Sequence, residues 1–437
     1  MDKSIQYALE CHTDVDGETG LLISALESAV NRLPFPVHSG CRLYPARPDV
    51  RFKLYFYRPE IPENLIHTYT YQPESNWTTY CPELSDGEWT NREHTVSEDG
   101  YVRVAVSTVP ETGINPGAAQ IQDFIRIEDP GHEERAVPGW MGRCCEKLLK
   151  KTSEVRQEND FLLFLLADTH DAVGGIWPDT LQSLRLAAAE LKPDALVHLG
   201  DFTDGLLPAD YTRTLAAKQL SELKEISGKL WCCVGNHDRN YFRGNSTPMS
   251  REECAQLYLG RTATWYYADV PEKRLRLLFL DSFDPEEKER YGFPDEEVRW
   301  MRRTLRGTPR DYRVLVFSHV PPVASIHVWS DSIRNEERML RALERFHRRR
   351  KGAVLGWIHG HSHADQVYRN RAFPIIGVGC SKLEDFPEHK PWGSVTYRRE
   401  QHSETQELWD VLLIHGESGG LDFLRFGAGE DRHVEGV

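Results

Sequence analysis

From about residue 38 to 109, apolar and polar positions alternate in short runs separated by Pro, Gly, Asn and Asp. A period of two places successive side chains on opposite faces of a strand. The clearest runs are RFKLYFYRP (51–59), IHTYTYQP (66–73) and GYVRVAVST (100–108). We therefore expect an all-β module from about residue 38 to 109. Strand density alone suits a sandwich or a barrel equally well.

The pattern changes after residue 110. Residues 111–138 are rich in Gly, Pro and acidic residues, and a helical pattern over 140–156 leads into the apolar run FLLFLLA (161–167). Strand-length apolar runs then alternate with helical patterns at 179–191 and 211–227, which is typical of an α/β fold with a parallel sheet. The later runs are ALVHLGD (195–201), LWCCVGN (230–236), LRLLFLD (275–281), RVLVFSH (313–319) and AVLGWIH (353–359).

This change divides the chain into two predicted domains. Residues 1–138 form a β-rich accessory domain with its linker, and residues 139–437 form the second domain. After residue 363 apolar and polar positions alternate again without helical patterns, so we expect antiparallel strands that close the second sheet. They are QVYRN (366–370), FPIIGVG (373–379), SVTYRRE (394–400), ELWDVLLIHG (407–416) and LDFLRFG (421–427).

Composition narrows the class of protein. With 437 residues, 40% of them apolar and 27% charged, the chain matches globular averages. A formal net charge of -14 disfavours broad binding to a nucleic-acid backbone, although the net charge does not exclude a local basic groove. No run approaches the roughly 20 apolar residues of a membrane span, and the N-terminus lacks a signal-like pattern. Nine cysteines without a CxxC zinc pattern fit a reduced compartment, so we expect a cytoplasmic protein.

Polar clusters follow five of the predicted strands. Ligands bind at the carboxyl ends of buried parallel strands, so these clusters should converge. Their oxygen and imidazole donors suit a pair of hard or borderline divalent ions, which a shared carboxylate holds about 3.5 to 4 Å apart. Asp201 is our candidate bridge. The clusters are Asp168-Thr169-His170, Gly200-Asp201-Phe202-Thr203-Asp204, Gly235-Asn236-His237-Asp238, His319, and Gly360-His361-Ser362-His363.

In this order, the five clusters resemble those of the calcineurin-like metallophosphoesterase superfamily, whose pattern runs DxH, GDxxD, GNH followed by an acid, a lone His, and GHxH. The likeness covers roughly residues 160–380. It implies an α/β fold, namely a four-layer αββα metallophosphoesterase sandwich, here preceded by a β-rich, sandwich-like N-terminal domain. The spelling looks closest to the cyclic-nucleotide and glycerophosphodiester phosphodiesterase branch.

The resemblance also implies a cofactor and a ligand set. Two divalent ions, Mn, Fe(II), Zn or Co, would share Asp201, and a hydroxide bridging them would attack phosphorus in line. One ion would be held by Asp168, His170 and His363, and the other by Asn236, His319 and His361.

The remaining motif residues receive roles in the same way. His237 resembles the catalytic histidine that stabilises the charged phosphate and protonates the leaving oxygen. Asp238, which we group with it as catalytic, and Asp204 would fix ring orientation and hold turns near the metals. In contrast, His198 and His359 lie inside apolar runs and are expected to be hydrogen-bonded core histidines.

Departures from relatives narrow the reaction. Asp204 stands where purple acid phosphatases place a Tyr ligand to ferric iron. The spellings GDFTDG and GNHD differ from the Asp-Arg-Gly turn and GNHE of Ser/Thr protein phosphatases. We therefore favour hydrolysis of a phosphodiester. A phosphomonoesterase or nucleotidase on the same site is the alternative, and a scaffold protein that has lost turnover is a third possibility.

Substrate contacts are expected on loops that follow the ligand clusters, because the strands are committed to the metals. An Arg side chain there could grip a phosphate bidentately and an indole could cover a base or sugar, although ordinary surface loops carry such residues too. The candidates are Arg239, Asn240, Arg243, His327 and Trp329. The substrate is a small-molecule or polymeric phosphate ester. Its identity, the native metals and the oligomeric state stay open.

Overall fold

The computed structural model describes residues 9–18, 22–31, 34–59, 78–109, 121–128, 136–171, 176–205, 209–241, 248–327, 329–384, 390 and 393–436. The chain divides into two compact units, Met1–Ala136 and Val137–Val437, and each is described by itself. The predicted run 66–73 and Arg243 lie outside the described residues.

The first unit is β-rich. A seven-stranded antiparallel sheet contains β1 (Leu9–Val15), β2 (Leu22–Asn31), β3 (Phe35–Val37), β5 (Val50–Pro59), β6 (Thr78–Tyr80), β7 (Asp86–Thr90) and β9 (Gly100–Thr108). A three-stranded sheet contains β4 (Arg42–Pro45), β8 (His94–Thr95) and β10 (Ile125–Glu128).

Alternation along β5 explains the core of the first unit. Phe52, Leu54 and Phe56 belong to one buried cluster, whereas Tyr55 and Tyr57 belong to another. Successive side chains of a strand point to opposite faces, so both faces of this strand are covered. The two tyrosines are 1% and 3% exposed and therefore serve as core residues, not as a binding surface.

The second unit contains two six-stranded sheets. In the first, β13 (Leu230–Cys232), β12 (Ala195–His198) and β11 (Phe161–Leu166) are parallel, and the antiparallel strands β20 (Leu408–Ile414), β21 (Leu421–Gly427) and β22 (Arg432–Val434) continue from β11. The second runs in the order β14 (Tyr266–Val270), β15 (Leu275–Leu280), β16 (Arg313–Ser318), β17 (Val354–His359), β19 (Ile375–Gly377) and β18 (Gln366–Tyr368).

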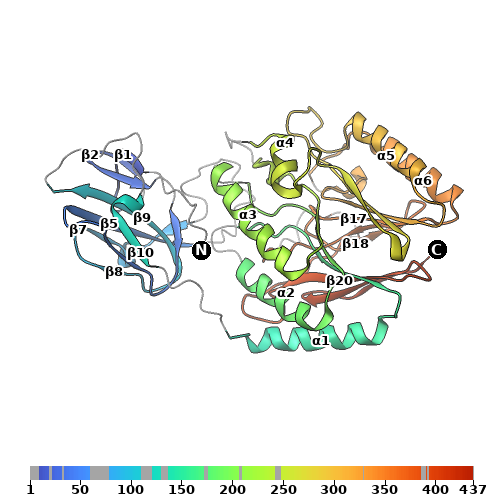
Figure 1. Cartoon of the computed structure of the whole chain (residues 1–437), viewed down its shortest axis with the longest axis horizontal. Coiled ribbons are helices and arrows are strands. Elements are labelled where there is room, and N and C mark those ends of the chain that lie inside the picture. The colour runs from blue at the N-terminus through green and yellow to red at the C-terminus, as the bar shows by residue number, and fades with distance from the viewer. Residues whose placement is uncertain are drawn as a thin grey trace. The chain divides into compact units, whose positions relative to one another are not determined.

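Helices pack on each sheet according to the alternation of its strands. Leu162 and Phe164 of β11 share a cluster with α1 (Gly139–Val155), α2 (Trp177–Leu191) and α3 (Ala209–Ile226), whereas Leu163 shares one with residues of the second sheet. Alternate residues of β15 and β16 pack instead with α5 (Asp295–Gly307) and α6 (Glu336–Arg349). Figure 1 shows α1, α2 and α3 near β20, with α5 and α6 on the opposite side of the strands. The short helix α4 spans Arg251–Cys254.

The C-terminal strands differ from the expectation in two ways. They divide between the sheets, because β20 pairs with β11 and β21 with β20, while β19 pairs in parallel with β17. The run 394–400 forms no strand beyond an isolated bridge at Val395. Arg399 within this run does not face solvent as a polar strand position would. It is 9% exposed and donates to the carbonyl oxygens of Cys380 and Ser381.

Within the described ranges, the structure contains no helix that is both long enough and apolar enough to span a bilayer.

Candidate metal centre

The motif residues follow the carboxyl ends of five parallel strands, β11, β12, β13, β16 and β17. Five of the seven predicted ligands adopt the left-handed backbone conformation that non-glycine residues rarely use. Such conformations persist where surrounding structure enforces them, and they concentrate at functional sites. Their φ angles are 54° at Asp168, 41° at His170, 57° at Asp201, 64° at His361 and 50° at His363.

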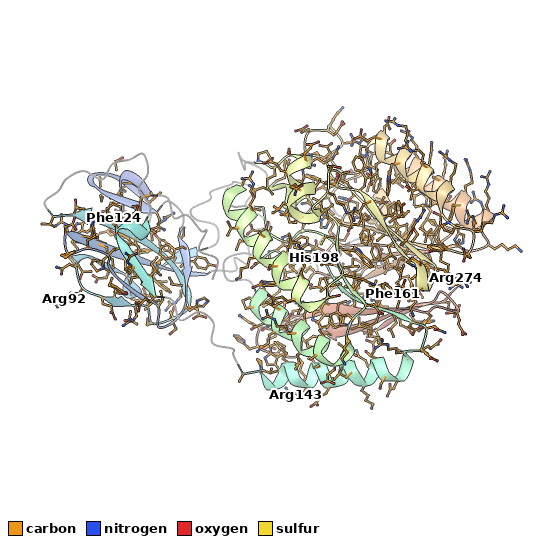
Figure 2. The ribbon with its side chains drawn as sticks, in the orientation of Figure 1. Arg92, Phe124, Arg143, Phe161, His198 and Arg274 are labelled. Atoms are coloured by element: carbon orange, nitrogen blue, oxygen red, sulfur yellow. The ribbon has the colours of Figure 1, made fainter. Side chains whose placement is uncertain are left out.

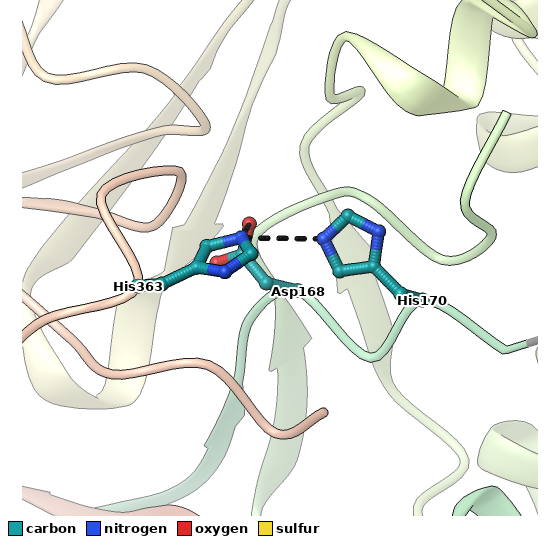
Figure 3. Close-up of side chains that lie close together, drawn as sticks. All are labelled: Asp168, His170 and His363. Atoms are coloured by element: carbon teal, nitrogen blue, oxygen red, sulfur yellow. Dashed lines mark hydrogen bonds and ion pairs between the residues drawn. The ribbon is translucent and has the colours of Figure 1, made fainter. Parts of the chain in front are cut away.

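One half of the site contains Asp168, His170 and His363. The Nε2 atom of His363 lies 3.3 Å from Asp168 Oδ1 and 3.2 Å from His170 Nε2. Figure 3 shows the two imidazoles facing each other beside the carboxylate. Burial, reinforced by neighbouring His237, holds the pKa of His170 well below its usual value. A neutral imidazole offers the lone pair that a metal ion requires.

The other half contains Asn236, His319 and His361. His319 Nε2 lies 3.0 Å from Asn236 Oδ1 and 3.2 Å from His361 Nδ1. The opposite ring nitrogen, Nδ1, lies 3.1 Å from the carbonyl oxygen of Leu199. A carbonyl oxygen only accepts, so Nδ1 carries hydrogen and Nε2 is directed into the cluster.

Asp201 lies between the two halves. Its Oδ2 is 3.1 Å from His319 Nε2 and 3.8 Å from His170 Nε2. Burial opposes its ionisation, but the imidazoles of His319 and His237 lower the pKa of Asp201 below its usual value. The bridging position predicted for this carboxylate is therefore geometrically available.

His237 opens a short 3-10 helix, η3 (His237–Arg239). Its Nδ1 donates to the carbonyl oxygen of Asp204 at 2.6 Å, which turns Nε2 toward Asp201 Oδ2 at 4.0 Å. The ring lies edge-on to His170, with centroids 5.0 Å apart. With 20% of its side chain exposed, His237 is accessible to a substrate.

The side chain of Asp238 lies among backbone amides. Its carboxylate is completely buried and accepts hydrogen bonds from the backbone amides of Asp201, Phe202 and Gly235, each at 2.8 Å. These contacts tie together the loops that follow β12 and β13. Asp238 therefore holds turns, as expected for one of its two predicted roles, and makes no described contact as a catalytic group. The backbone carbonyl of Asp204 orients His237.

The predicted substrate contacts separate into three groups. Arg239 and Asn240 are buried at 2% and 0% exposure, with Arg239 Nε donating to Met249 O and Asn240 Oδ1 accepting from Thr212. These bonds hold the loop together, so a role in substrate binding stays a prediction. The ring of His327 lies 4.9 Å from that of His361, and Trp329 is exposed beside it. Arg243 lies outside the described residues.

Sequence reasoning missed two residues beside the ligands. The Tyr291 ring lies 5.2 Å from that of His361 and 4.4 Å from that of His327. Glu384 Oε1 accepts a hydrogen bond from His363 Nδ1. Glu384 belongs to the loop after the last ligand cluster, which looked functional, but no motif spelling distinguishes it from its neighbours.

The two histidines assigned to the core are buried. His198 Nε2 lies 3.0 Å from Thr169 Oγ1, and the ring stacks on Phe202 within the second unit (Figure 2). His359 Nδ1 donates to the carbonyl oxygen of Gly360 at 2.9 Å. Both side chains are thus buried and hydrogen-bonded, as expected for core histidines.

Comparison with known proteins agrees with this geometry. Residues 161–365 match the family described as calcineurin-like phosphoesterase. These residues form a calcineurin-like phosphoesterase domain. The donors fit the two divalent ions that this family implies, because Asp168, His170 and His363 gather ligand atoms within 4.8 Å of one another, as do Asp201, His319 and His361.

Individual relatives are more distant. A protein of Rhodococcus erythropolis described as a probable cyclic nucleotide phosphodiesterase is 31% identical over 188 residues, which cover 40% of this chain and 57% of that protein. The chain thus matches little more than half of that relative's length. A dimetal phosphatase from Danio rerio is 17% identical, covering 63% of this chain and 99% of its own, with a TM-score of 0.47. GAP50, described as the anchor in the inner membrane complex of Plasmodium, is 14% identical, and the match covers 64% of this chain and 89% of that chain with a TM-score of 0.40.

Proposed function

We propose that this protein is a metal-dependent phosphodiesterase in which His237 assists the leaving group. The observation that carries the proposal is the place of Asp201 between two ligand sets, with His237 Nε2 directed toward the same carboxylate. A family match over the segment that carries these residues supports it. The second unit is then the four-layer αββα sandwich that the sequence resemblance implies, a view supported by its three separate hydrophobic clusters.

The ligands divide between two positions. Asp168, His170 and His363 would hold one ion, Asn236, His319 and His361 the other, and Asp201 both. Two divalent ions, Mn, Fe(II), Zn or Co, would lower the pKa of a water molecule and neutralise the phosphate oxygens. The protein contributes fixed geometry, since His319 and Asp168 are held by hydrogen bonds to the backbone.

His237 is suited to move a proton. Because Nδ1 donates to the Asp204 carbonyl, the ring cannot rotate freely and Nε2 is the nitrogen that faces the cluster. A proton on Nε2 would pass to the leaving oxygen as its bond to phosphorus breaks. Partial exposure of the side chain leaves room for the substrate.

Two observations favour a diester over a monoester. Arg239, the arginine next to the GNHD cluster, is 2% exposed and its Nε donates to Met249 O, so little of its guanidinium is accessible to a phosphate. A monoester carries nearly two negative charges and gains more than a diester from such a clamp. The similarity to a relative described as a cyclic nucleotide phosphodiesterase points the same way.

Parallel kinetics test the proposal. The Mn-loaded chain should show a higher kcat/KM for bis-p-nitrophenyl phosphate than for p-nitrophenyl phosphate, because this ratio reports differential stabilisation of the transition states. Cyclic nucleotides and glycerophosphodiesters then extend the profile to natural classes of substrate. A monoester preference with each of Mn, Zn and Co would overturn the diesterase assignment and favour a phosphomonoesterase.

A further inference from the structure

The hydrogen bond between His363 and Glu384 joins two loops of the second unit. His363 follows β17, and Glu384 follows β19. The Glu384 side chain is 6% exposed, and its Oε1 accepts from His363 Nδ1. The opposite nitrogen of the ring, Nε2, faces Asp168 and His170. One imidazole thus connects a buried carboxylate to the predicted metal position.

We propose that Glu384 is a positioning residue of the metal centre. By accepting the Nδ1 hydrogen, it fixes the tautomer and the orientation of His363, so that the Nε2 lone pair is directed at the ion shared with Asp168 and His170. A carboxylate behind a ligating histidine also makes the ring a stronger ligand. This inference rests on the metal centre of the proposed function.

The backbone before Glu384 is anchored to the same strand end that carries Asp168. Ser381 N donates to Ala167 O at 2.8 Å, and Lys382 N donates to Asp168 O at 3.0 Å. The buried Arg399 adds bonds to the carbonyl oxygens of this segment. Glu384 is therefore held in a fixed relation to Asp168, and through its side chain it holds His363 in the same frame.

The neighbouring thiol does not turn this cluster into a third metal site. Cys380, His363 and Glu384 each place one candidate donor atom within 4.8 Å of the others. However, Cys380 Sγ donates to Lys382 O at 3.3 Å, and His363 Nδ1 carries the hydrogen bonded to Glu384. Both atoms are thus already engaged in hydrogen bonds. Glu384 Oε2 has no hydrogen-bond partner among the described residues, so the carboxylate is hydrogen-bonded there through Oε1 to His363.

Metal titration of the full-length, metal-free chain tests this role. Wild type should take up two Mn²⁺ ions in calorimetry. Glu384→Ala should weaken one of the two steps roughly 10-fold to 100-fold and leave the other unchanged, because loss of such a partner typically reduces metal affinity by that amount. Glu384→Gln keeps an acceptor oxygen and should lose less. Glu417→Ala, at an exposed glutamate of the same unit, should match wild type.

A positioning role also predicts rescue by mass action. Activity lost in Glu384→Ala at low Mn²⁺ should return at saturating Mn²⁺, a response that a general packing defect would not give. If the alanine variant does not fold, the glutamine variant carries the comparison. Two wild-type affinities in a folded Glu384 variant would overturn the role of Glu384 alone. Failure of wild type itself to bind two ions would overturn the metal centre and, with it, this inference.

Discussion

Single side chains decide the chemistry of the site, and His237 is the most informative of them. His237→Ala should keep both metals and the fold but lose roughly 100-fold or more in kcat, as expected when a positioned general acid is removed. The loss should be larger for a poor leaving group such as an alkoxide than for p-nitrophenolate, which needs little protonation. Steady-state kinetics with both leaving groups, beside metal analysis of the variant, measure this. Near wild-type rates on the poor leaving group would exclude the acid role.

The motifs indicated which residues gather at the site, but not the direction in which each side chain points. The seven proposed ligands lie together, because each follows the carboxyl end of a parallel strand in one of the two sheets of the second unit. Adjacency in sequence could not tell that Asp238 faces backbone amides while His237 faces Asp201. Nor could it identify Glu384, which reaches His363 only because the loop after β19 is anchored to Ala167 and Asp168.

At the scale of elements, a buried ion network joins β20 and β21 to the loop that carries His363. Arg425, 1% exposed, pairs with Asp410 at 2.8 Å and with Asp365 at 2.9 Å. Removing one partner of a buried pair leaves an uncompensated charge, which costs about 3–5 kcal/mol. Arg425→Ala should therefore lower the free energy of unfolding by ~3 kcal/mol, the lower end, because Arg432 still pairs with both carboxylates.

Denaturant unfolding of the metal-free chain measures this loss. The matched control is Arg143→Ala, because Arg143 lies on the outer side of α1 (Figure 2) and its pair with Glu404 is largely exposed. Exposed pairs contribute about 0–1 kcal/mol. Equal losses in the two variants would contradict the assigned importance of the buried network.

His415 at the end of β20 gives the second unit a pH dependence of its own. Its ring donates to Asp160 at 2.9 Å and to Asp422 at 2.8 Å. Burial lowers the pKa of His415, but these hydrogen bonds raise it above the usual 6.5. The folded state then binds the proton more tightly than the unfolded chain, so the stabilisation is complete below 6.5 and is lost as pH rises through the folded pKa.

The comparison of wild type with His415→Gln isolates this contribution. Because the histidines of the metal centre are common to both proteins, their titration cancels in the difference. The variant should be destabilised more at about pH 6 than at about pH 9 in thermal or denaturant unfolding. A destabilisation that is constant across this range, or larger at high pH, would contradict the charged state assigned to His415.

Elements with long, regular patterns were predictable, and those fixed by tertiary contacts were not. The run 161–167 was expected as a strand and forms β11, because its continuous apolar face suits burial on both sides. Alternation wrongly predicted a strand over residues 394–400, which form only an isolated bridge at Val395, while Arg399 donates to the carbonyl oxygens of Cys380 and Ser381. The sheet to which β20 belongs is set by its pairing with β11. The alternation of residues along one strand does not show which strand it pairs with.

At the scale of the whole molecule, every described residue of the metal centre lies in Val137–Val437, which forms a compact unit with its own clusters. A chain of residues 137–437 should therefore fold and bind the same two ions as the full-length protein. Calorimetric titration with Mn²⁺ and the unfolding transition provide the comparison. Loss of metal binding in a folded 137–437 chain would show that the first unit contributes to the site.

In the proposed metal centre, seven side chains from five strand ends hold two metal ions through a shared Asp201. Elemental analysis of the purified chain after loading with Mn²⁺ or Zn²⁺, alongside Asp201→Asn, tests it most directly. We predict close to two ions per wild-type chain, because the ligands form two sets around one carboxylate, and a clear loss of metal in the variant. One ion or none in wild type, or an Asp201→Asn chain that still holds two, would contradict it.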